Sequence, residues 1–136
     1  MTAQRIVRPL TAFSVASAKQ RRPRQEDKDH LNFLRGLHCC LCGAPGPDAA
    51  HIRAASPIHG KQESGLQRKA DDKWTVPLCR AHHDEQHAAG DELKWWASKG
   101  LDPFGIALSL YSASGDDEVC EAILQSNRMH LKEHAE

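Results

Sequence analysis

Residues 74–87 of this chain read WTVPLCRAHHDEQH and place four possible metal ligands within nine residues. The apolar run at 74–78 is typical of a short strand, and the absence of Gly and Pro from 80–89 favours a helix directly after it. The four ligands are Cys79, His82, His83 and His87. The first two are three residues apart and the last two are four apart, so each pair shares one face of the helix. This junction therefore predicts two separate pairs of ligands, although surface histidines on a polar helix are the alternative.

A second group of cysteines precedes this stretch, where residues 39–43 read CCLCG. Cys39 and Cys42 have the two-residue gap of a zinc knuckle. Together with Cys79 and His82 they make a complete tetrahedral set, which predicts a closed, structural Zn²⁺ site. Cys40 does not fit this spacing and is left as a spare.

Composition indicates one ordinary soluble domain: the chain has 136 residues, 40% apolar and 26% charged, with a net charge of zero. Zero net charge argues against a uniformly basic nucleic-acid coat. No apolar run of about 18 residues and no signal-like N-terminus is present, so we expect a cytoplasmic protein without a membrane partner. In that compartment the five cysteines are expected to act as thiolates and not as disulfides.

The charge is distributed unevenly along the chain. Residues 1–25 carry six basic and no acidic side chains, whereas acidic residues predominate from 81 onward. A basic end of this kind is typical of a flexible arm that contacts phosphates, although a solvated tail without a partner is the alternative. The predicted nucleic-acid contacts are Arg21, Arg22, Arg24, Arg53, Lys61 and Lys69.

The remaining elements follow from periodicity and turn signals. The expected elements are a helix over 25–37, a strand over 48–53, a polar loop over 54–73, and helices over 91–99, 103–113 and 116–133. We expect Cys120, on the last helix, to be a buried thiol without a ligand role.

The second ligand pair predicts chemistry at a phosphate. His51 lies at the end of the first strand, and Asp72 precedes the second. If the two strands form a hairpin on the helix, His51 and the pair His83 and His87 converge. A divalent ion could then hold a phosphate oxygen and stabilise the leaving 3′ oxygen, while His51 deprotonates the attacking water. This arrangement predicts phosphodiester hydrolysis.

At these residues the chain resembles the His-Asn-His endonuclease superfamily, whose fold is a ββα-metal unit. It looks most like the phage-associated branch that includes the RecA-dependent recombination-enhancement nuclease and many prophage proteins. The resemblance covers about residues 37–110. The matching text is Cys39-x-x-Cys42-Gly43, Ala50-His51-Ile52-Arg53, Lys69-x-x-Asp72-x-Trp74-Thr-Val-Pro-Leu-Cys79-x-x-His82-His83-x-x-x-His87 and Gly100-x-Asp102-Pro103.

The resemblance implies an α+β fold with a small, zinc-stabilised ββα-metal core over 26–113. From composition and periodicity we expect a flexible basic arm over 1–25 before this core and a C-terminal helix over 114–136 packed on the same domain. The resemblance also implies a metal-dependent DNA endonuclease of phage or prophage origin, linked to DNA recombination or processing.

In site terms the resemblance makes His51 the general base and places His83 and His87 at a catalytic Mg²⁺, Mn²⁺ or Ni²⁺. Two positions depart from the family pattern. Ala50 stands where many relatives have a metal ligand, and the middle Asn is missing, with Asp72 or Thr75 nearest in order.

Two other functions remain open. One is a non-catalytic zinc-containing DNA-binding module, in which His51, His83 and His87 hold a second structural zinc and basic side chains contact phosphates. The basic side chains concerned are Arg53, Lys61, Arg68 and Lys69. The other is a recombination accessory protein that acts through a recombinase or replication protein.

Overall fold

The computed structural model describes residues 24–62 and 70–135. Its elements are, in chain order, α2 (Lys28–Arg35), β1 (Asp48–His51), the 3₁₀ helix η2 (Pro57–His59), β2 (Thr75–Leu78), α3 (Arg80–Ala89), α4 (Glu92–Lys99), α5 (Pro103–Ser112) and α6 (Asp117–Ala135). The predicted α+β class is confirmed. Most of the predicted arm, up to residue 23, and residues 63–69 of the predicted loop lie outside the described residues.

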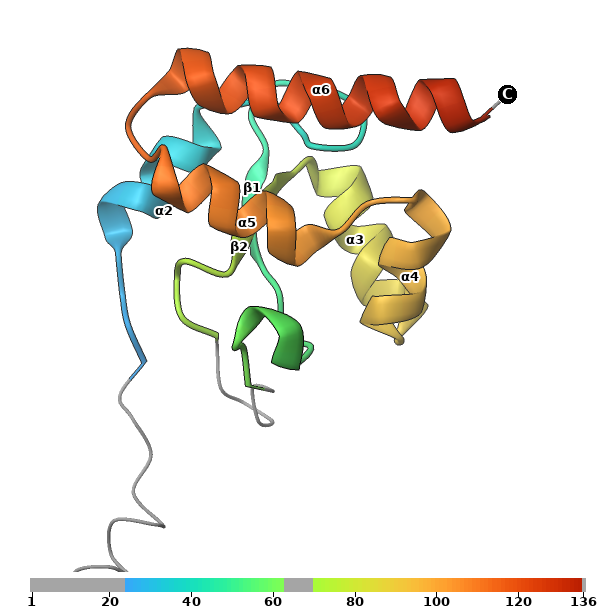
Figure 1. Ribbon diagram of the computed structural model, residues 1–136, viewed down its shortest axis with the longest axis horizontal. Helices are drawn as coiled ribbons and strands as arrows, with labels where there is room; N and C mark the ends of the chain where they lie inside the picture. Colours follow the sequence, from blue (N-terminus) through green and yellow to red (C-terminus); the bar gives the residue numbers. More distant parts are fainter. Residues whose placement is uncertain (1–23, 63–69, 136) are drawn as a thin grey trace, which may run out of the picture.

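β1 and β2 form a two-stranded antiparallel sheet at the centre of the described fold (Figure 1). Asp48 pairs with Leu78 and His51 with Thr75, and one further bond from the Ile52 N–H to the Trp74 carbonyl extends the ladder. Both strands are shorter than the sequence patterns predicted, by one or two residues at one end. This pairing puts Asp48 beside the start of α3 and His51 at the opposite end of the hairpin.

Pro77 sits inside β2 without weakening the sheet. Its carbonyl accepts the Cys40 N–H at 2.9 Å, so its polar edge faces away from β1. The N–H and C=O of a strand residue point to the same edge, and the N–H that proline lacks would therefore not have joined the ladder. Pro77 thus provides an outer edge on which the cysteine knuckle docks.

The knuckle is a tight turn held by its own backbone. The Cys39 N–H donates to the Ala44 carbonyl at 2.9 Å, and the Gly43 N–H donates to the Cys39 carbonyl at 3.0 Å. Gly43 has φ +79°, a conformation that costs glycine little and other residues more. The turn and its contact with Pro77 together place Cys39 and Cys42 next to the junction of β2 and α3.

The helices begin where the sequence provides caps. Asp27, Asp91 and Asp102 each accept a backbone N–H from the first turn of the helix that follows, and Gly100 ends α4 in the left-handed conformation. α3 differs from the other helices because none of its side chains is buried. Packing of apolar side chains therefore contributes little to holding α3 in place.

One buried core joins the described elements. Its members include Leu34 from α2, Val76 from β2, Leu110 from α5 and Leu124 from α6. α6 lies beside α5 across one end of the molecule (Figure 1). The buried Cys120 thiol donates to the Ala113 carbonyl at 3.4 Å, as expected of a core thiol. No helix in the described ranges has the length and apolar character needed to cross a membrane.

Residues 24–27 are fastened to residues 70–72, just before β2. The Gln25 N–H donates to Asp71 Oδ1 at 2.9 Å, and the Gln25 carbonyl accepts the Asp72 N–H at 2.9 Å. The Asp27 N–H donates to Asp72 Oδ2 at 2.7 Å, and Arg24 donates to both the Ala70 carbonyl and Asp72 Oδ1. Asp72 is 1% exposed. The Asp27 N–H and Arg24 therefore replace hydrogen bonds to water that its buried carboxylate has lost.

The Asp72 carboxylate makes a pH-dependent contribution to stability. Burial by itself raises its pKa, but the Asp27 N–H, His51 and Arg24 together hold the pKa below its ordinary value. A depressed native pKa stabilises the fold above the unfolded-state pKa, and this contribution is lost as the pH falls through the native value.

We therefore expect Asp72→Asn to lower the free energy of unfolding at neutral pH by about 1.5–3 kcal/mol, the usual range for hydrogen bonds to a charged group. The difference from wild type should narrow below about pH 4. Urea unfolding over a pH series measures both quantities, with Asp71→Asn as the less buried control. A difference that stayed constant with pH would contradict this account of Asp72.

Candidate functional site

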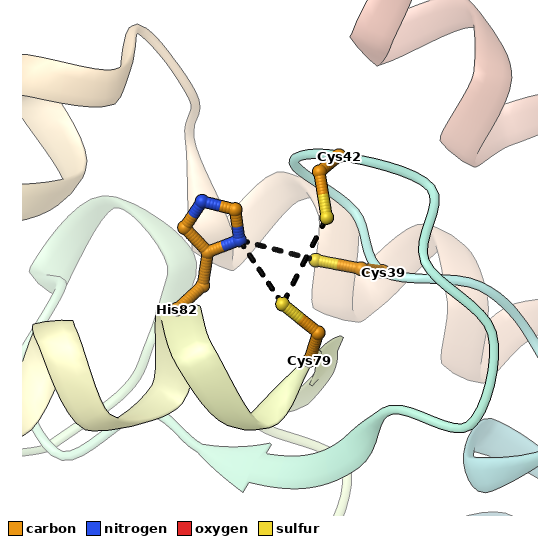
Figure 2. A group of neighbouring side chains, drawn as sticks. All are labelled: Cys39, Cys42, Cys79 and His82. Atoms are coloured by element: carbon orange, nitrogen blue, oxygen red, sulfur yellow. Dashed lines mark hydrogen bonds between the residues drawn. The ribbon is translucent and has the colours of Figure 1, made fainter.

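The four predicted ligands of the zinc set lie together, with their ligand atoms all within 4.8 Å of one another. Figure 2 shows Cys39 and Cys42 on the knuckle facing Cys79 and His82 at the start of α3. The Cys79 Sγ to His82 Nδ1 distance is 3.2 Å, Cys39 Sγ to His82 Nδ1 is 3.7 Å, and Cys42 Sγ to Cys79 Sγ is 3.8 Å. Ligands around a tetrahedral zinc are about 3.5–3.8 Å apart, given the usual bond lengths. The cluster can therefore hold a metal ion such as zinc.

The electrostatics of the cluster differ from one thiol to the next. Burial opposes ionisation of Cys39, but the N–H groups of Cys42, Cys79 and Leu41 and the His82 ring outweigh it and lower its pKa to about 6. For Cys42, burial and then the neighbouring Cys39 and Cys79 thiols raise the pKa to about 11. The lowered pKa makes Cys39 the thiol of the knuckle that ionises more readily, in the form that binds a metal ion.

Cys40 takes no part in this cluster. Its thiol is fully buried, burial raises its pKa, and its backbone N–H is bonded to Pro77. The spare cysteine of the knuckle therefore serves the core.

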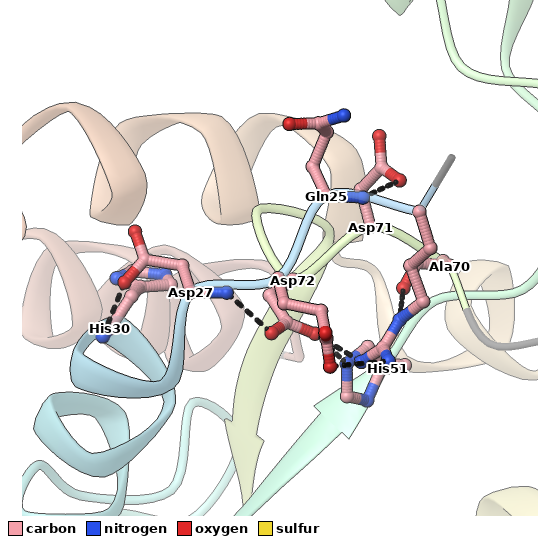
Figure 3. Close-up of polar contacts among 9 residues, drawn as sticks. Gln25, Asp27, His30, His51, Ala70, Asp71 and Asp72 are labelled. Atoms are coloured by element: carbon pink, nitrogen blue, oxygen red, sulfur yellow. Dashed lines mark hydrogen bonds and ion pairs between the residues drawn. The ribbon is translucent and has the colours of Figure 1, made fainter. Parts of the chain in front are cut away.

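His51 and Asp72 form a hydrogen-bonded pair at the end of β1 (Figure 3). His51 Nε2 lies 2.8 Å from Asp72 Oδ1, which also accepts Arg24 at 2.6 Å. An ionised carboxylate can only accept, so the neutral His51 ring carries its proton on Nε2 and leaves a lone pair on Nδ1. The Asp72 side chain is 1% exposed and the His51 side chain 16% exposed. The buried carboxylate therefore holds the ring in place, and solvent reaches part of the ring.

His83 and His87 form the second pair of predicted ligands, on α3. Their Nε2 atoms are 3.1 Å apart and their ring centroids 4.8 Å apart. Two imidazole nitrogens that bind one ion at adjacent positions are about 3–3.4 Å apart, given Zn–N bond lengths. The pair therefore has the spacing of two ligands of a single ion.

His51 was predicted to converge with His83 and His87, but the three rings do not form a three-ligand metal site. In the part of the chain that the structure describes, the Cys39, Cys42, Cys79 and His82 cluster is the one group of three or more ligand atoms within 4.8 Å. His51 is bonded to Asp72, whereas His83 Nδ1 is 3.0 Å from Asp48 Oδ2. The histidines thus fall into a pair on the helix and a separate carboxylate-bound ring on the strand.

The basic residues predicted to contact nucleic acid have different environments. Arg53 is exposed. Lys61 is 4% exposed and donates to the carbonyls of Arg53 and Gln62, so it stabilises its own loop and the predicted phosphate contact is not supported. Arg24 is likewise engaged, with Asp72 and Ala70. Arg21, Arg22 and Lys69, and the additional candidate Arg68, lie outside the described residues.

Two acidic residues of the site have roles that the sequence did not predict: Asp48 was weighed only as a substitute for the missing ligand at Ala50 and set aside, and Glu92 was missed. Asp48 bonds to His83, and Glu92 accepts the N–H groups of Arg53 and Ala54 at 3.0 and 2.8 Å. For Asp48 the sequence did contain a signal. It lies two residues before Ala50, so the two side chains share one face of the strand and Asp48 could be expected near the same site. Glu92 had none, since its partners come from a segment 38 or 39 residues away.

Comparisons with known proteins identify a family but no activity. A family model described as "Protein of unknown function (DUF968)" matches residues 12–113. The uncharacterized protein YdfU of Escherichia coli (strain K12) is 33% identical over 67 residues, which are 49% of this chain and 18% of YdfU. No solved structure matches significantly. The family model spans most of the chain, including the knuckle, both strands and α3. The protein therefore belongs to the DUF968 family.

Proposed function

We propose that this protein is a metal-dependent DNA endonuclease of the His-Asn-His type that hydrolyses phosphodiester bonds, of phage or prophage origin and active in DNA recombination or processing. The observation that carries the proposal is the His51–Asp72 pair, in which a buried carboxylate orients a partly exposed imidazole ring. The resemblance at the motifs of residues 39–87 adds to it.

The Cys39, Cys42, Cys79 and His82 cluster has a structural role in this proposal. Four protein ligands fill a tetrahedral zinc and leave no open position for water or substrate, so such a zinc stabilises and does not catalyse. It would fasten the knuckle to the first turn of α3, which has no buried side chain of its own.

His51 is the general base. Its Nδ1 takes a proton from a water molecule, whose oxygen attacks the phosphorus while the bond to the leaving 3′ oxygen breaks. Asp72 keeps the Nε2 proton in place and stabilises the ring once it is positively charged. Arg24 and the Asp27 N–H keep Asp72 ionised and correctly placed. Asp72 thus orients the base, and it is one of the two residues, with Thr75, nearest in order to the family Asn that this chain lacks.

His83 and His87 would hold the catalytic divalent ion through their Nε2 atoms. Imidazole donors suit Ni²⁺ best of the three ions; Mg²⁺ and Mn²⁺ both prefer oxygen, and Mn²⁺, as a transition-metal ion, binds imidazole more readily than Mg²⁺. When bound, such an ion supplies positive charge at a phosphate oxygen and at the leaving oxygen. Two protein ligands leave several positions open, and Ala50, 2% exposed, offers no third ligand.

A non-catalytic zinc-containing DNA-binding module is the second candidate. Within the described ranges, the Cys39, Cys42, Cys79 and His82 cluster is the one group of three or more metal ligands. A structural zinc without a complete catalytic metal site favours this function. In that function, exposed basic residues such as Arg53 contact phosphates and no bond is cleaved. A recombination accessory protein that acts through a recombinase would bind no DNA even at low salt.

The zinc proposal predicts one zinc per purified chain, measured by elemental analysis. Cys42→Ser should lose the metal and loosen α3, since apparent zinc-binding free energies in small domains are about 10 kcal/mol or more. Cys40→Ala, at the neighbouring buried thiol, should keep the metal. Retention of zinc and thermal stability by Cys42→Ser would exclude this ligand set.

The assignment of the base predicts that His51→Ala slows nicking of supercoiled plasmid by at least about 100-fold, the lower range for general-base catalysis. The assay is run with Mg²⁺, Mn²⁺ and Ni²⁺. Zinc content should not change, because His51 is bonded to Asp72 and not to the cluster. His38→Ala is the matched control, as that ring pairs with Glu121. Equal rates for wild type and His51→Ala would remove His51 as the base, and an inert wild type would favour the binding module.

The basic arm predicts a salt effect without a change in chemistry. Deletion of residues 2–22 leaves the contacts of Arg24 intact and should reduce the slope of log affinity against log salt by about 0.9 for each lost phosphate contact. Arg24→Gln should instead slow cleavage, because Arg24 bonds to the carboxylate that orients His51, and should leave the slope of log affinity against log salt unchanged. An unchanged slope after the deletion would rule out the arm as a DNA contact.

A further inference from the structure

Asp48, Arg80, His83 and His87 form a connected chain of polar groups between the start of β1 and α3. Asp48 Oδ2 is 3.0 Å from His83 Nδ1 and 3.2 Å from a terminal guanidinium nitrogen of Arg80. On the far side of the His83 ring, Nε2 is 3.1 Å from His87 Nε2. The His83 and Asp48 side chains are 20% and 29% exposed, so water competes for this contact less than at an open surface.

The contact with Asp48 determines which nitrogen of His83 is free. An ionised carboxylate accepts hydrogen bonds and cannot donate them, so His83 carries its proton on Nδ1 when it faces Asp48. Its Nε2 then has a lone pair directed toward His87. A neutral imidazole binds a metal ion through such a lone pair, and a carboxylate on the other nitrogen fixes the ring and increases its basicity.

Asp48 lies in the wrong place to coordinate the same ion directly. Its oxygen approaches His83 from the Nδ1 side, whereas the space between the two rings is on the Nε2 side. Asp48 therefore does not supply the ligand that Ala50 lacks. Its effect is to orient one of the two ligands that are present.

We propose that Asp48 is a positioning residue for a divalent transition-metal cation, such as Mn²⁺ or Ni²⁺, held by His83 and His87. The inference rests on the proposed function, because the cation is the one assigned there to catalysis. It adds a residue that explains how His83, one of the two histidine ligands on an exposed helix, is oriented before the ion binds. A site with few protein ligands depends strongly on such orientation, since each ligand that must be ordered on binding costs affinity.

Mn²⁺ titration of the zinc-loaded protein, followed by calorimetry, tests the proposal. Asp48→Asn should weaken Mn²⁺ binding by about 10- to 100-fold, the usual effect of removing an outer carboxylate. Asp84→Asn is the matched control, because Asp84 also pairs with Arg80 but lies on the exposed surface of α3. It removes the same charge near the same arginine and should leave the affinity unchanged. His83→Ala and His87→Ala should abolish binding and so identify the site.

A second measurement does not depend on any variant. Long-range ¹H–¹⁵N correlation spectra of the zinc-loaded wild-type protein, recorded before Mn²⁺ is added, report the tautomer of the His83 ring, and the expected form has the proton on Nδ1. A proton on Nε2, an Asp48→Asn variant that binds Mn²⁺ as tightly as wild type, or a wild type that binds no Mn²⁺ at this pair would each overturn the proposal.

The outcome is distinguishable from that of the nuclease proposal. Weaker Mn²⁺ binding by Asp48→Asn in a protein that never nicks plasmid would support the role of Asp48 and refute the nuclease. Active nicking with equal affinities would support the nuclease and refute the role of Asp48.

Discussion

The placement of α3 is the constraint on which the rest of the site depends. This ten-residue helix buries no side chain, and a helix of that length is not stable alone in water. Polar contacts hold it instead: His82 faces the cysteines, His83 bonds to Asp48, and Gln86 bonds to Glu92 at 2.9 Å. Such contacts are directional, so the helix is fixed in rotation as well as position. A metal in the cysteine cluster would secure the N-terminal end, where the first turn otherwise depends on hydrogen bonds alone.

The hairpin sets the distance between the two kinds of chemistry. β1 is four residues long, with Asp48 at one end and His51 at the other. Each end carries a carboxylate–imidazole pair, one directed to α3 and one to the segment before β2. The pairs differ in burial, because the Asp72 side chain is 1% exposed and bonded to three donors, whereas the Asp48 side chain is 29% exposed. The His51 ring is therefore the more firmly oriented of the two, and the His83 ring the more adaptable.

Arg24 and Lys61 show why charge in a sequence does not identify a nucleic-acid contact. Both were predicted to reach phosphates, yet Lys61 is buried against two carbonyls, and Arg24 pairs with Asp72 from 48 residues away. A basic side chain is drawn to whatever buried acceptors the fold brings near it, and those acceptors are distant in sequence. The Arg53 side chain, by contrast, is exposed to solvent. Only its backbone N–H is bonded within the fold, to the Glu92 carboxylate.

The sequence alone determined the α+β class, the strand-to-helix junction and the membership of the Cys39, Cys42, Cys79 and His82 cluster. These features depend on local periodicity, caps and ligand spacings, which act over a few residues. The assignment of Asp72 to His51, of Asp48 to His83 and of Arg24 to Asp72 was decided only by the tertiary structure. Each of those contacts joins segments 21 to 48 residues apart, and no local pattern encodes which polar group a buried carboxylate will find. That choice is made when the chain folds, because a carboxylate removed from water must take the donors that the surrounding segments supply.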